Sequence, residues 1–343
     1  MKVLHVLNSR IYSGAEKVVC QIIKSFRGEI DMVYTSPESD IVAQMLDEQE
    51  VTYLPMKTMS VSELSRVIRE QKPDLIHAHD MRAGLFSALC CGKIPLVSHI
   101  HNNAYDARGL SPKTVGYLIA GFKAKHILWV SQSSFDGYAF HKFFAKKSSV
   151  LYNIIDTQQI SDKKMQDLQT YDFDMIYVGR LTFQKDPQRL MRLCARLKQD
   201  KPDLKVAIVG TGELLEEAQS LCKSLNIQEN VHFLGFQSNP IKMVADSKAM
   251  ILTSRWEGTP MCALEAMYLG TPVVSTPSDG MKDLLEDGVS GYLTDDDEQM
   301  AQDLLKIFAD PAHRTVLADN AKRKFDSIND ADAYKKAILD CYI

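Results

Sequence analysis

One unit recurs along the 343-residue chain and limits the folds that it can adopt: a short run rich in β-branched residues, a turn, and a helical stretch. Strands that alternate with helices pair in parallel, because each return to the start of the sheet needs a crossover connection. The sequence therefore predicts parallel α/β structure. The first set of runs lies at 2–8, 30–36, 51–55, 74–79, 94–100, 126–131 and 148–153.

A polar segment, 156–172, interrupts the pattern, and a second set of runs follows it. Since the length suits two domains better than one, we predict two parallel-sheet domains at 1–160 and 161–324, with a helix in 325–343 crossing back onto the first. Ligands bind at the carboxyl ends of parallel strands, so two facing domains would hold one ligand in a central cleft. The second set of runs lies at 173–179, 204–210, 230–235, 248–254, 271–276 and 290–294.

The composition is that of a globular chain, with 45% hydrophobic and 24% charged residues. No stretch reaches the roughly 18 uninterrupted apolar residues of a membrane-spanning helix, and Glu16 and Lys17 fall where a signal-peptide core would lie. The 7 cysteines form no C-x-x-C pair, so neither a disulfide framework nor a zinc site is indicated. We expect a cytoplasmic protein with reduced cysteines.

The net charge of −4 is unevenly spread. Residues 1–160 hold 18 basic against 15 acidic residues, whereas residues 161–343 hold 22 against 29. The N-terminal half is therefore the part better suited to an anionic surface. A pI of about 6.2 and the lack of a dense basic patch argue against nucleic acid as a partner.

The segment 254–275 places Glu257 and Glu265 on either side of a Thr-Pro step. Thr259 is a typical N-cap and Gly270 a typical C-terminal cap, so a helix is predicted over 260–269. Its free N–H groups, including those of Met261 and Cys262, would suit an anionic ligand. The alternative is a surface helix with two solvated glutamates, and the spacing alone does not decide between them.

Three further loops follow predicted strands. Arg180 and Lys185 lie in the loop 179–186, where a guanidinium and an ammonium could bind phosphate, or could simply be solvated. Gly14, in the first βα loop, permits a close approach of backbone to a ligand, although G-x-G-x-x-G is absent there. The G-x-G at 210–212 alone indicates only a tight turn.

Histidines 77, 79, 99 and 101 lie close to predicted strand ends. His77 and His79 would share one face of their strand, and Asp80 would lie on the other. No second carboxylate ligand is evident, so we expect no metal ion here. His101, beyond its strand end, is better placed for the cleft, with a loop histidine bonded to backbone as the alternative.

Taken together, these residues resemble the retaining glycosyltransferases of family 4, which have the GT-B architecture of two Rossmann-like domains facing a central cleft. The resemblance runs from residue 2 to about residue 310. Its most specific part is the order of a G-R-L-x-x-x-K loop before an E-x7-E segment. The matching stretches are SGAEK (13–17), HIHNN (99–103), VSQSS (130–134), GRLTFQKD (179–186), VGTGELLEE (209–217), HFLGF (232–236) and EGTPMCALEAMYLGTPVVS (257–275).

The resemblance implies a role for each matching residue. Arg180 and Lys185 would bind the donor diphosphate and stabilise the leaving nucleoside diphosphate, and Gly14 would approach it from the other domain. Glu257 and His101 would contact the transferred sugar. The remaining donor-binding residues are Glu265 on the ribose, Gly212 and Phe236 beside the base, and Thr259, Pro260, Met261 and Cys262 along the backbone.

The resemblance also implies a mechanism without metal or cofactor, because positioned cations can stabilise the charge that develops on the diphosphate. Retention would follow from front-face substitution, in which the leaving phosphate helps deprotonate the acceptor. Two positions depart from the family pattern: Ser13 replaces a glycine of the first loop, and Ile154 replaces the glycine of an Asn-Gly-Ile-Asp turn. The first bears on how closely the phosphate approaches, and the second on the turn between domains.

The family implies a nucleotide-sugar donor, most simply a UDP-sugar, and a glycan or lipid-linked acceptor in cell-surface polysaccharide synthesis. Lysines and aromatics in 121–126 and 140–149 could bring the N-terminal domain to the inner face of an anionic membrane. The alternative places Phe140, Phe143 and Phe144 in the core. Two other functions stay open: a sugar-nucleotide epimerase on the same architecture, and a non-catalytic partner subunit. The donor sugar, acceptor and linkage are not encoded in any motif.

Overall fold

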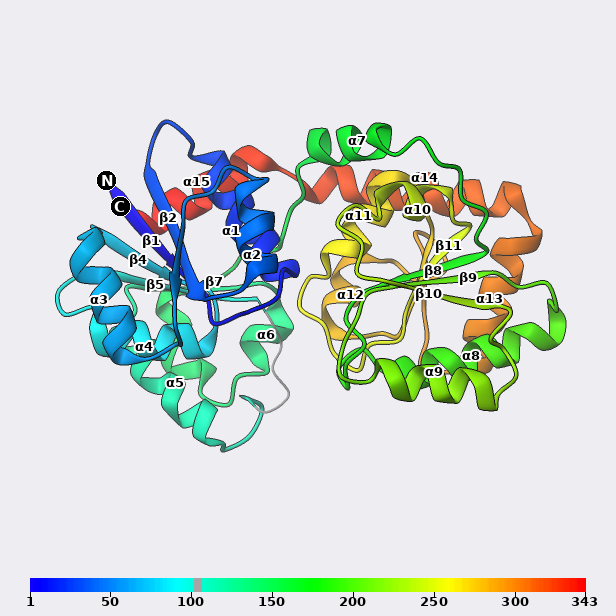
Figure 1. The fold of residues 1–343 in the computed structure, drawn as a ribbon, viewed down its shortest axis with the longest axis horizontal. Coiled ribbons are helices and arrows are strands. Elements are labelled where there is room, and N and C mark those ends of the chain that lie inside the picture. The colour runs from blue at the N-terminus through cyan, green and yellow to red at the C-terminus, as the bar shows by residue number, and fades with distance from the viewer. Residues whose placement is uncertain (102–106) are drawn as a thin grey trace. The chain divides into compact units, whose positions relative to one another are not determined.

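The chain divides into two units in a computed structural model that describes residues 1–101 and 107–343. Unit 1 contains residues 1–154 together with 330–343, and unit 2 contains residues 155–329 (Figure 1). Each unit has a sheet in which neighbouring strands pair in parallel, as the alternation of strands and helices predicts. The parallel α/β fold class is confirmed.

The sheet of unit 1 has the strand order β3-β2-β1-β4-β5-β6-β7. The order reverses between β1 and β4, which makes the loops after these two strands neighbours. The strands are β1 (Lys2–Val6), β2 (Asp31–Pro37), β3 (Tyr53–Met56), β4 (Leu75–Ala78), β5 (Leu96–Ile100), β6 (His126–Trp129) and β7 (Ser148–Val150). The helices are α1 (Gly14–Ser25), α2 (Asp40–Asp47), α3 (Val61–Gln71), α4 (Met81–Cys90), α5 (Pro112–Lys123), α6 (Gln132–Asp136), the 3-10 helix η2 (His141–Lys147) and α15 (Ala331–Tyr342).

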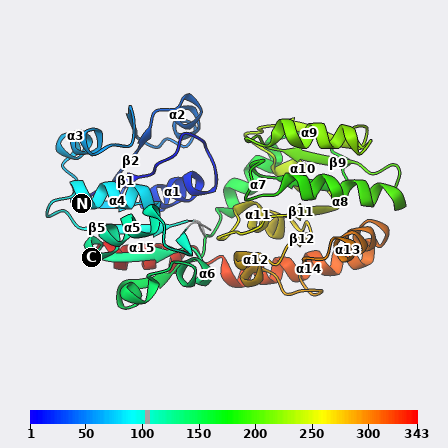
Figure 2. The same ribbon diagram turned by 90° about the horizontal axis from the view of Figure 1, so that it is seen from below.

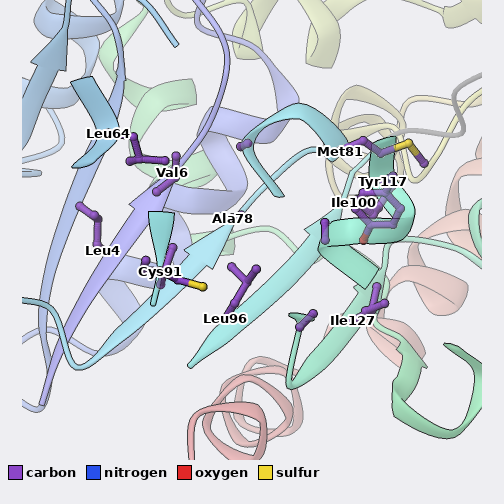
Figure 3. Close-up of a cluster of buried hydrophobic side chains, with 14 of the residues drawn as sticks. Leu4, Val6, Leu64, Ala78, Met81, Cys91, Leu96, Ile100, Tyr117 and Ile127 are labelled. Atoms are coloured by element: carbon purple, nitrogen blue, oxygen red, sulfur yellow. The ribbon is translucent and has the colours of Figure 1, made fainter. Parts of the chain in front are cut away.

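One face of this sheet packs against α3, α4 and α5 through a continuous apolar cluster (Figure 3). Every second residue of the strands, such as Leu4, Ile76 and Ile100, points into it. Phe144 of η2 joins the cluster because Gly121 lacks a side chain: a Cβ there would lie 2.4 Å from the ring. Phe140 packs at the edge of the cluster, whereas Phe143 is 69% exposed. The alternative that places all three phenylalanines in the core is therefore wrong for Phe143.

The C-terminal helix α15 lies against unit 1 (Figures 1 and 2). The hydroxyl of Tyr342 lies 2.8 Å from Nδ1 of His77, and the Tyr342 ring contacts that of Phe26. Lys335 forms a 2.5 Å ion pair with Glu29. These contacts confirm the prediction that the last helix crosses back onto the first domain.

The sheet of unit 2 has the order β10-β9-β8-β11-β12-β13, and its order reverses between β8 and β11. Helices α8, α9 and α13 cover one face through a second apolar cluster, and Figure 2 shows α8 beside α9. The strands are β8 (Met175–Val178), β9 (Val206–Val209), β10 (Val231–Gly235), β11 (Ala249–Leu252), β12 (Val273–Ser275) and β13 (Tyr292–Leu293). The helices are α7 (Thr157–Gln166), α8 (Pro187–Asp200), α9 (Leu215–Ser224), α10 (Ile241–Asp246), α11 (Met261–Leu269), α12 (Asp279–Leu284), α13 (Asp297–Ala309) and α14 (Pro311–Ile328).

The divisions between the units fall at 154/155 and 329/330, whereas the sequence placed them at 160/161 and 324/325. Asn329 explains both positions, since its side-chain amide bonds the backbone N–H and the carbonyl of Ile155. Helix α7 also belongs to unit 2, where Ser161 lies 2.7 Å from the hydroxyl of Tyr268. The hydrophobic periodicity of the sequence does not predict such hydrogen bonds between distant segments.

Candidate functional site

The reversal of strand order in unit 2 brings together two loops that are far apart in the sequence. The loop 179–186 follows β8 and the loop 253–260 follows β11, and β8 and β11 are adjacent strands. In parallel sheets, a crevice at such a reversal is where ligands bind. Two of the predicted site segments are therefore neighbours.

Side chains and backbone fasten these two loops to each other. The hydroxyl of Thr253 donates to the carbonyl of Lys185 at 3.0 Å, and the amide of Gln184 donates to the carbonyl of Trp256 at 2.9 Å. Arg255 forms a 2.7 Å ion pair with Asp186. The relative position of the two loops is thus set by several directional contacts, as a binding site requires.

Lys185 and Glu257 form an ion pair at the centre of these loops. Glu257 is only 4% exposed, and its Oε1 also accepts a 2.6 Å hydrogen bond from the hydroxyl of Ser254. A buried carboxylate needs such partners, because the loss of hydration is otherwise uncompensated. The sequence proposed both residues as ligand contacts but gave no sign that they contact each other.

Helix α11 begins at Met261, with Pro260 as its N-cap residue and without a side-chain cap. The predicted capping role of Thr259 is therefore wrong: a proline with extended backbone already occupies the N-cap position. Gly270 ends the helix in the left-handed conformation, as predicted. Glu265 is 2% exposed, so the alternative of two solvated surface glutamates is excluded.

Two glycines allow backbone segments to touch at this site. A Cβ on Gly212 would lie 2.2 Å from the carbonyl oxygen of Leu181, so the loop after β9 rests directly on the loop after β8. A Cβ on Gly280, in α12, would lie 1.2 Å from the carbonyl oxygen of Gly258. Gly280 was missed by sequence reasoning, since an isolated glycine early in a short helix carries no signal of what it touches.

Arg180, in the loop after β8, and Phe236, in the loop after β10, are both exposed. The backbone at Arg180 is fixed, because the buried hydroxyl of Tyr177 donates to its carbonyl at 2.8 Å. Burial raises the pKa of Tyr177, so this phenol stays a neutral donor. The guanidinium of Arg180 is exposed and, within the described ranges, forms no ion pair with the protein. It is available to an anion from solvent.

The remaining predicted residues lie in unit 1. Gly14 is the first residue of α1, and Ser13 before it is the N-cap, with its N–H 2.8 Å and its hydroxyl 2.7 Å from Oε2 of Glu16. This capping box explains Ser13 where the family pattern has glycine. Burial raises the pKa of the Glu16 carboxyl.

His101 directly follows β5, and Nε2 of its ring lies 2.9 Å from Nδ1 of His79. It is therefore bonded to another histidine, and no described residue offers it a backbone partner. His77 and His79 share one face of the sheet, as predicted, and their rings stack at a centroid distance of 4.1 Å. Asp80 instead caps α4 by accepting from the N–H of Ala83. Asn102 and Asn103 of the HIHNN stretch lie outside the described residues.

Comparison with known families assigns a model to each half of the chain. Residues 13–159 match the model described as Glycosyltransferase Family 4, and residues 158–324 match that described as Glycosyl transferases group 1. The two matches meet near the division between the units. Every predicted site residue lies within one of the two matched ranges.

Two similar proteins agree with this assignment, and one solved structure has a similar fold. An uncharacterized glycosyltransferase of Methanocaldococcus jannaschii is 32% identical over 62% of this chain and 57% of its own. The N-acetylgalactosamine-N,N'-diacetylbacillosaminyl-diphospho-undecaprenol 4-alpha-N-acetylgalactosaminyltransferase of Campylobacter jejuni is 35% identical over 55% of this chain and 53% of its own. The alignments thus span just over half the length of these relatives. The crystal structure of Anabaena HepE with UDP-glucose has a TM-score of 0.85 at 23% identity, covering 99% of this chain and 98% of that one.

Proposed function

The chain belongs by both of its domains to the glycosyltransferases, and from this premise we propose that it transfers a hexose-type sugar from a UDP-sugar to a lipid-linked glycan acceptor. The proposed reaction retains the configuration of the sugar and serves cell-surface polysaccharide synthesis. A UDP donor is supported by the nucleotide bound in the HepE structure. The lipid-linked acceptor is supported by the undecaprenol-linked substrate in the name of the Campylobacter relative.

The observation that carries this proposal is the charge arrangement at the strand reversal of unit 2. Lys185 and Glu257 form a buried pair there, and Arg180, in the same loop as Lys185, is exposed. Cleavage of a sugar–phosphate bond leaves negative charge on the diphosphate, which fixed cations stabilise. We assign Arg180 and Lys185 to the diphosphate and Glu257 to the sugar hydroxyls, with no metal ion or cofactor.

The backbone of the same loops completes the proposed donor site. The N-terminal turn of α11 offers N–H groups to an anion, and Glu265 in this helix is assigned to the ribose. Gly212 and Phe236 are assigned to the base, because their loops follow β9 and β10 at the same edge of the sheet. In unit 1, Gly14 is assigned to the diphosphate and His101 to the sugar. Thr259, Pro260, Met261 and Cys262 are assigned to the donor through their backbone.

Thermal unfolding with a panel of nucleotides and nucleotide sugars tests the donor. A ligand at 100 times its Kd stabilises the folded state by about 2.7 kcal/mol, so UDP is expected to raise Tm by roughly 5–10 °C. The UDP-sugar that is the donor should release UDP only when an acceptor glycan is supplied, and EDTA should leave the rate unchanged. Interconversion of UDP-sugars without UDP release would favour the epimerase instead, and no shift with any nucleotide would contradict both enzymes.

We also propose that unit 1 attaches peripherally to an anionic membrane. Among the described residues, no helix has both the length and the apolar character to cross a bilayer. On α5, however, Val115, Ile119 and Phe122 are exposed at helical spacing along one face, and Phe122 is 66% exposed. The exposed lysines that could contact anionic headgroups are Lys113, Lys123, Lys142 and Lys146.

Sedimentation with vesicles tests this surface. Replacing Ile119 and Phe122 together by serine should weaken binding to phosphatidylglycerol vesicles by roughly tenfold or more, since two apolar side chains no longer leave water. Val316→Ser, an exposed apolar position on α14 of unit 2, is the matched control. Failure of the unaltered protein to sediment at low salt, or equal binding by the double variant, would reject the membrane contact.

A further inference from the structure

Five histidines form a stacked group on one face of the unit 1 sheet: His5, His77, His79, His99 and His101. They come from β1, β4, β5 and the positions directly after β4 and β5, and alternation along the strands places them on the face opposite the cluster of Figure 3. All except His101 are completely buried. The candidate site uses only His101, so the other four rings need an explanation.

Three of these rings are joined in one chain of hydrogen bonds that ends on a sulfur. Nε2 of His101 lies 2.9 Å from Nδ1 of His79, and Nε2 of His79 lies 2.8 Å from Nδ1 of His5. Nε2 of His5 lies 3.4 Å from the thioether sulfur of Met32 in β2. At the other end, Nδ1 of His101 is buried and has no hydrogen-bond partner within the described part of the chain.

The three imidazole rings in this series of hydrogen bonds are neutral. Burial lowers the pKa of His5 and of His101 to about 3, and it lowers the pKa of His79 well below the usual range. A neutral imidazole carries one N–H donor and one acceptor nitrogen. In each ring, therefore, if one nitrogen donates a hydrogen bond, the other must accept one.

The sulfur decides the direction of the chain, because a thioether can accept but never donate. Nε2 of His5 consequently carries the proton and its Nδ1 accepts from Nε2 of His79. By the same rule Nδ1 of His79 accepts from Nε2 of His101. Met32 thus determines, through two intervening rings, which nitrogen of His101 is protonated.

We propose that Met32, His5 and His79 are positioning residues that hold His101 in its Nε2–H tautomer and so leave Nδ1 as a hydrogen-bond acceptor for a substrate sugar hydroxyl. The assignment of a sugar to His101 rests on the proposed function, whereas the tautomer follows from the hydrogen-bond chain alone. An unprotonated Nδ1 can accept a hydrogen bond that the sugar hydroxyl donates. The opposite tautomer would present an N–H at the same place.

The test is the ¹⁵N spectrum of the full chain labelled at histidine, in which protonated and unprotonated ring nitrogens have well-separated shifts. The His101 signals are identified by their loss in His101→Gln. We expect a protonated Nε2 and an unprotonated Nδ1 in the unaltered protein, and a mixture of tautomers in Met32→Leu and in His5→Phe. Met32→Leu keeps the apolar volume and carries the test even where His5→Phe does not fold. His126→Gln, a histidine bonded to Ser149 outside this chain, should change nothing at His101.

The same variants give a kinetic readout. Loss of one oriented hydrogen bond should lower kcat/KM for the donor by up to about tenfold. A His101 protonated at Nδ1, an unchanged tautomer in both Met32→Leu and His5→Phe, or a stoichiometric metal ion bound by these rings would overturn the inference. Absence of transfer by the unaltered protein with every UDP-sugar would reject the proposed function instead, since the spectrum needs no substrate.

Discussion

Replacing Lys185 by alanine is expected to lower kcat for sugar transfer by about 10²- to 10³-fold, the usual effect of removing one oriented group that stabilises developing negative charge. In the proposed reaction that charge develops on the departing diphosphate, which no solvent molecule can stabilise equally well. Steady-state kinetics with the donor found in the nucleotide panel measures the effect. Lys185→Arg keeps the charge but changes its geometry, so its kcat should lie between that of the unaltered protein and that of Lys185→Ala.

The ion pair with Glu257 makes the stability of this variant a necessary control. Removing one partner of a buried pair leaves an uncompensated carboxylate, which costs about 3–5 kcal/mol of unfolding free energy. The double variant Lys185→Ala, Glu257→Gln removes that charge and should recover part of the stability while transfer stays low. Lys198→Ala removes a lysine of the same unit whose ammonium donates to the carbonyl of Asn226, and it should leave both quantities unchanged. Near-normal turnover in Lys185→Ala would reject the assigned role.

Gly280→Ala is expected to lower kcat/KM for the donor by about 10²-fold, because displacing a positioning loop by about 1 Å has effects of this size. The added Cβ would lie 1.2 Å from the carbonyl oxygen of Gly258, so the backbone of α12 and that of the loop 253–260 must separate. Glu257 lies in this loop and would lose its alignment with Lys185. The crowding should also cost about 1–3 kcal/mol of unfolding free energy.

The response to UDP and one control variant separate misplacement of the loop from a general loss of structure. The rise in Tm that UDP produces should be smaller in Gly280→Ala than in the unaltered protein. Lys282→Ala changes an exposed side chain of the same helix and should keep both binding and turnover. Unaltered UDP binding and turnover in Gly280→Ala would show that the close backbone contact does not position the donor site.

Much of the fold could be predicted from the sequence, because the signals involved are local. The alternation of apolar runs with helical stretches marked the strands of both sheets, and Gly270 marked the end of α11. The boundaries differ by a few residues, since strand ends depend on neighbouring strands. Thr259 shows the limit of local rules. Its residue type favours the N-cap position, but Pro260, whose backbone is extended, occupies that position.

The candidate site was predicted less completely. The residues of the loops 179–186 and 253–260 were identified, since loops after parallel strands are the usual positions for ligand contacts. Their contacts with one another were not identified. The pairing of Lys185 with Glu257 joins residues 72 apart in sequence and depends on β8 lying beside β11. The contact of Gly280 with Gly258 depends likewise on how α12 packs.

The histidines show the same difference between what the sequence predicts and what the tertiary structure adds. The sequence by itself determined that His77 and His79 share a face, because side chains of a strand alternate with a period of two. Only the tertiary structure placed His5 and His101 beside them and joined three rings to Met32, since these residues come from four separate segments of one sheet. Periodicity along the chain determines which face a residue occupies, whereas the order of strands determines which residues meet on that face.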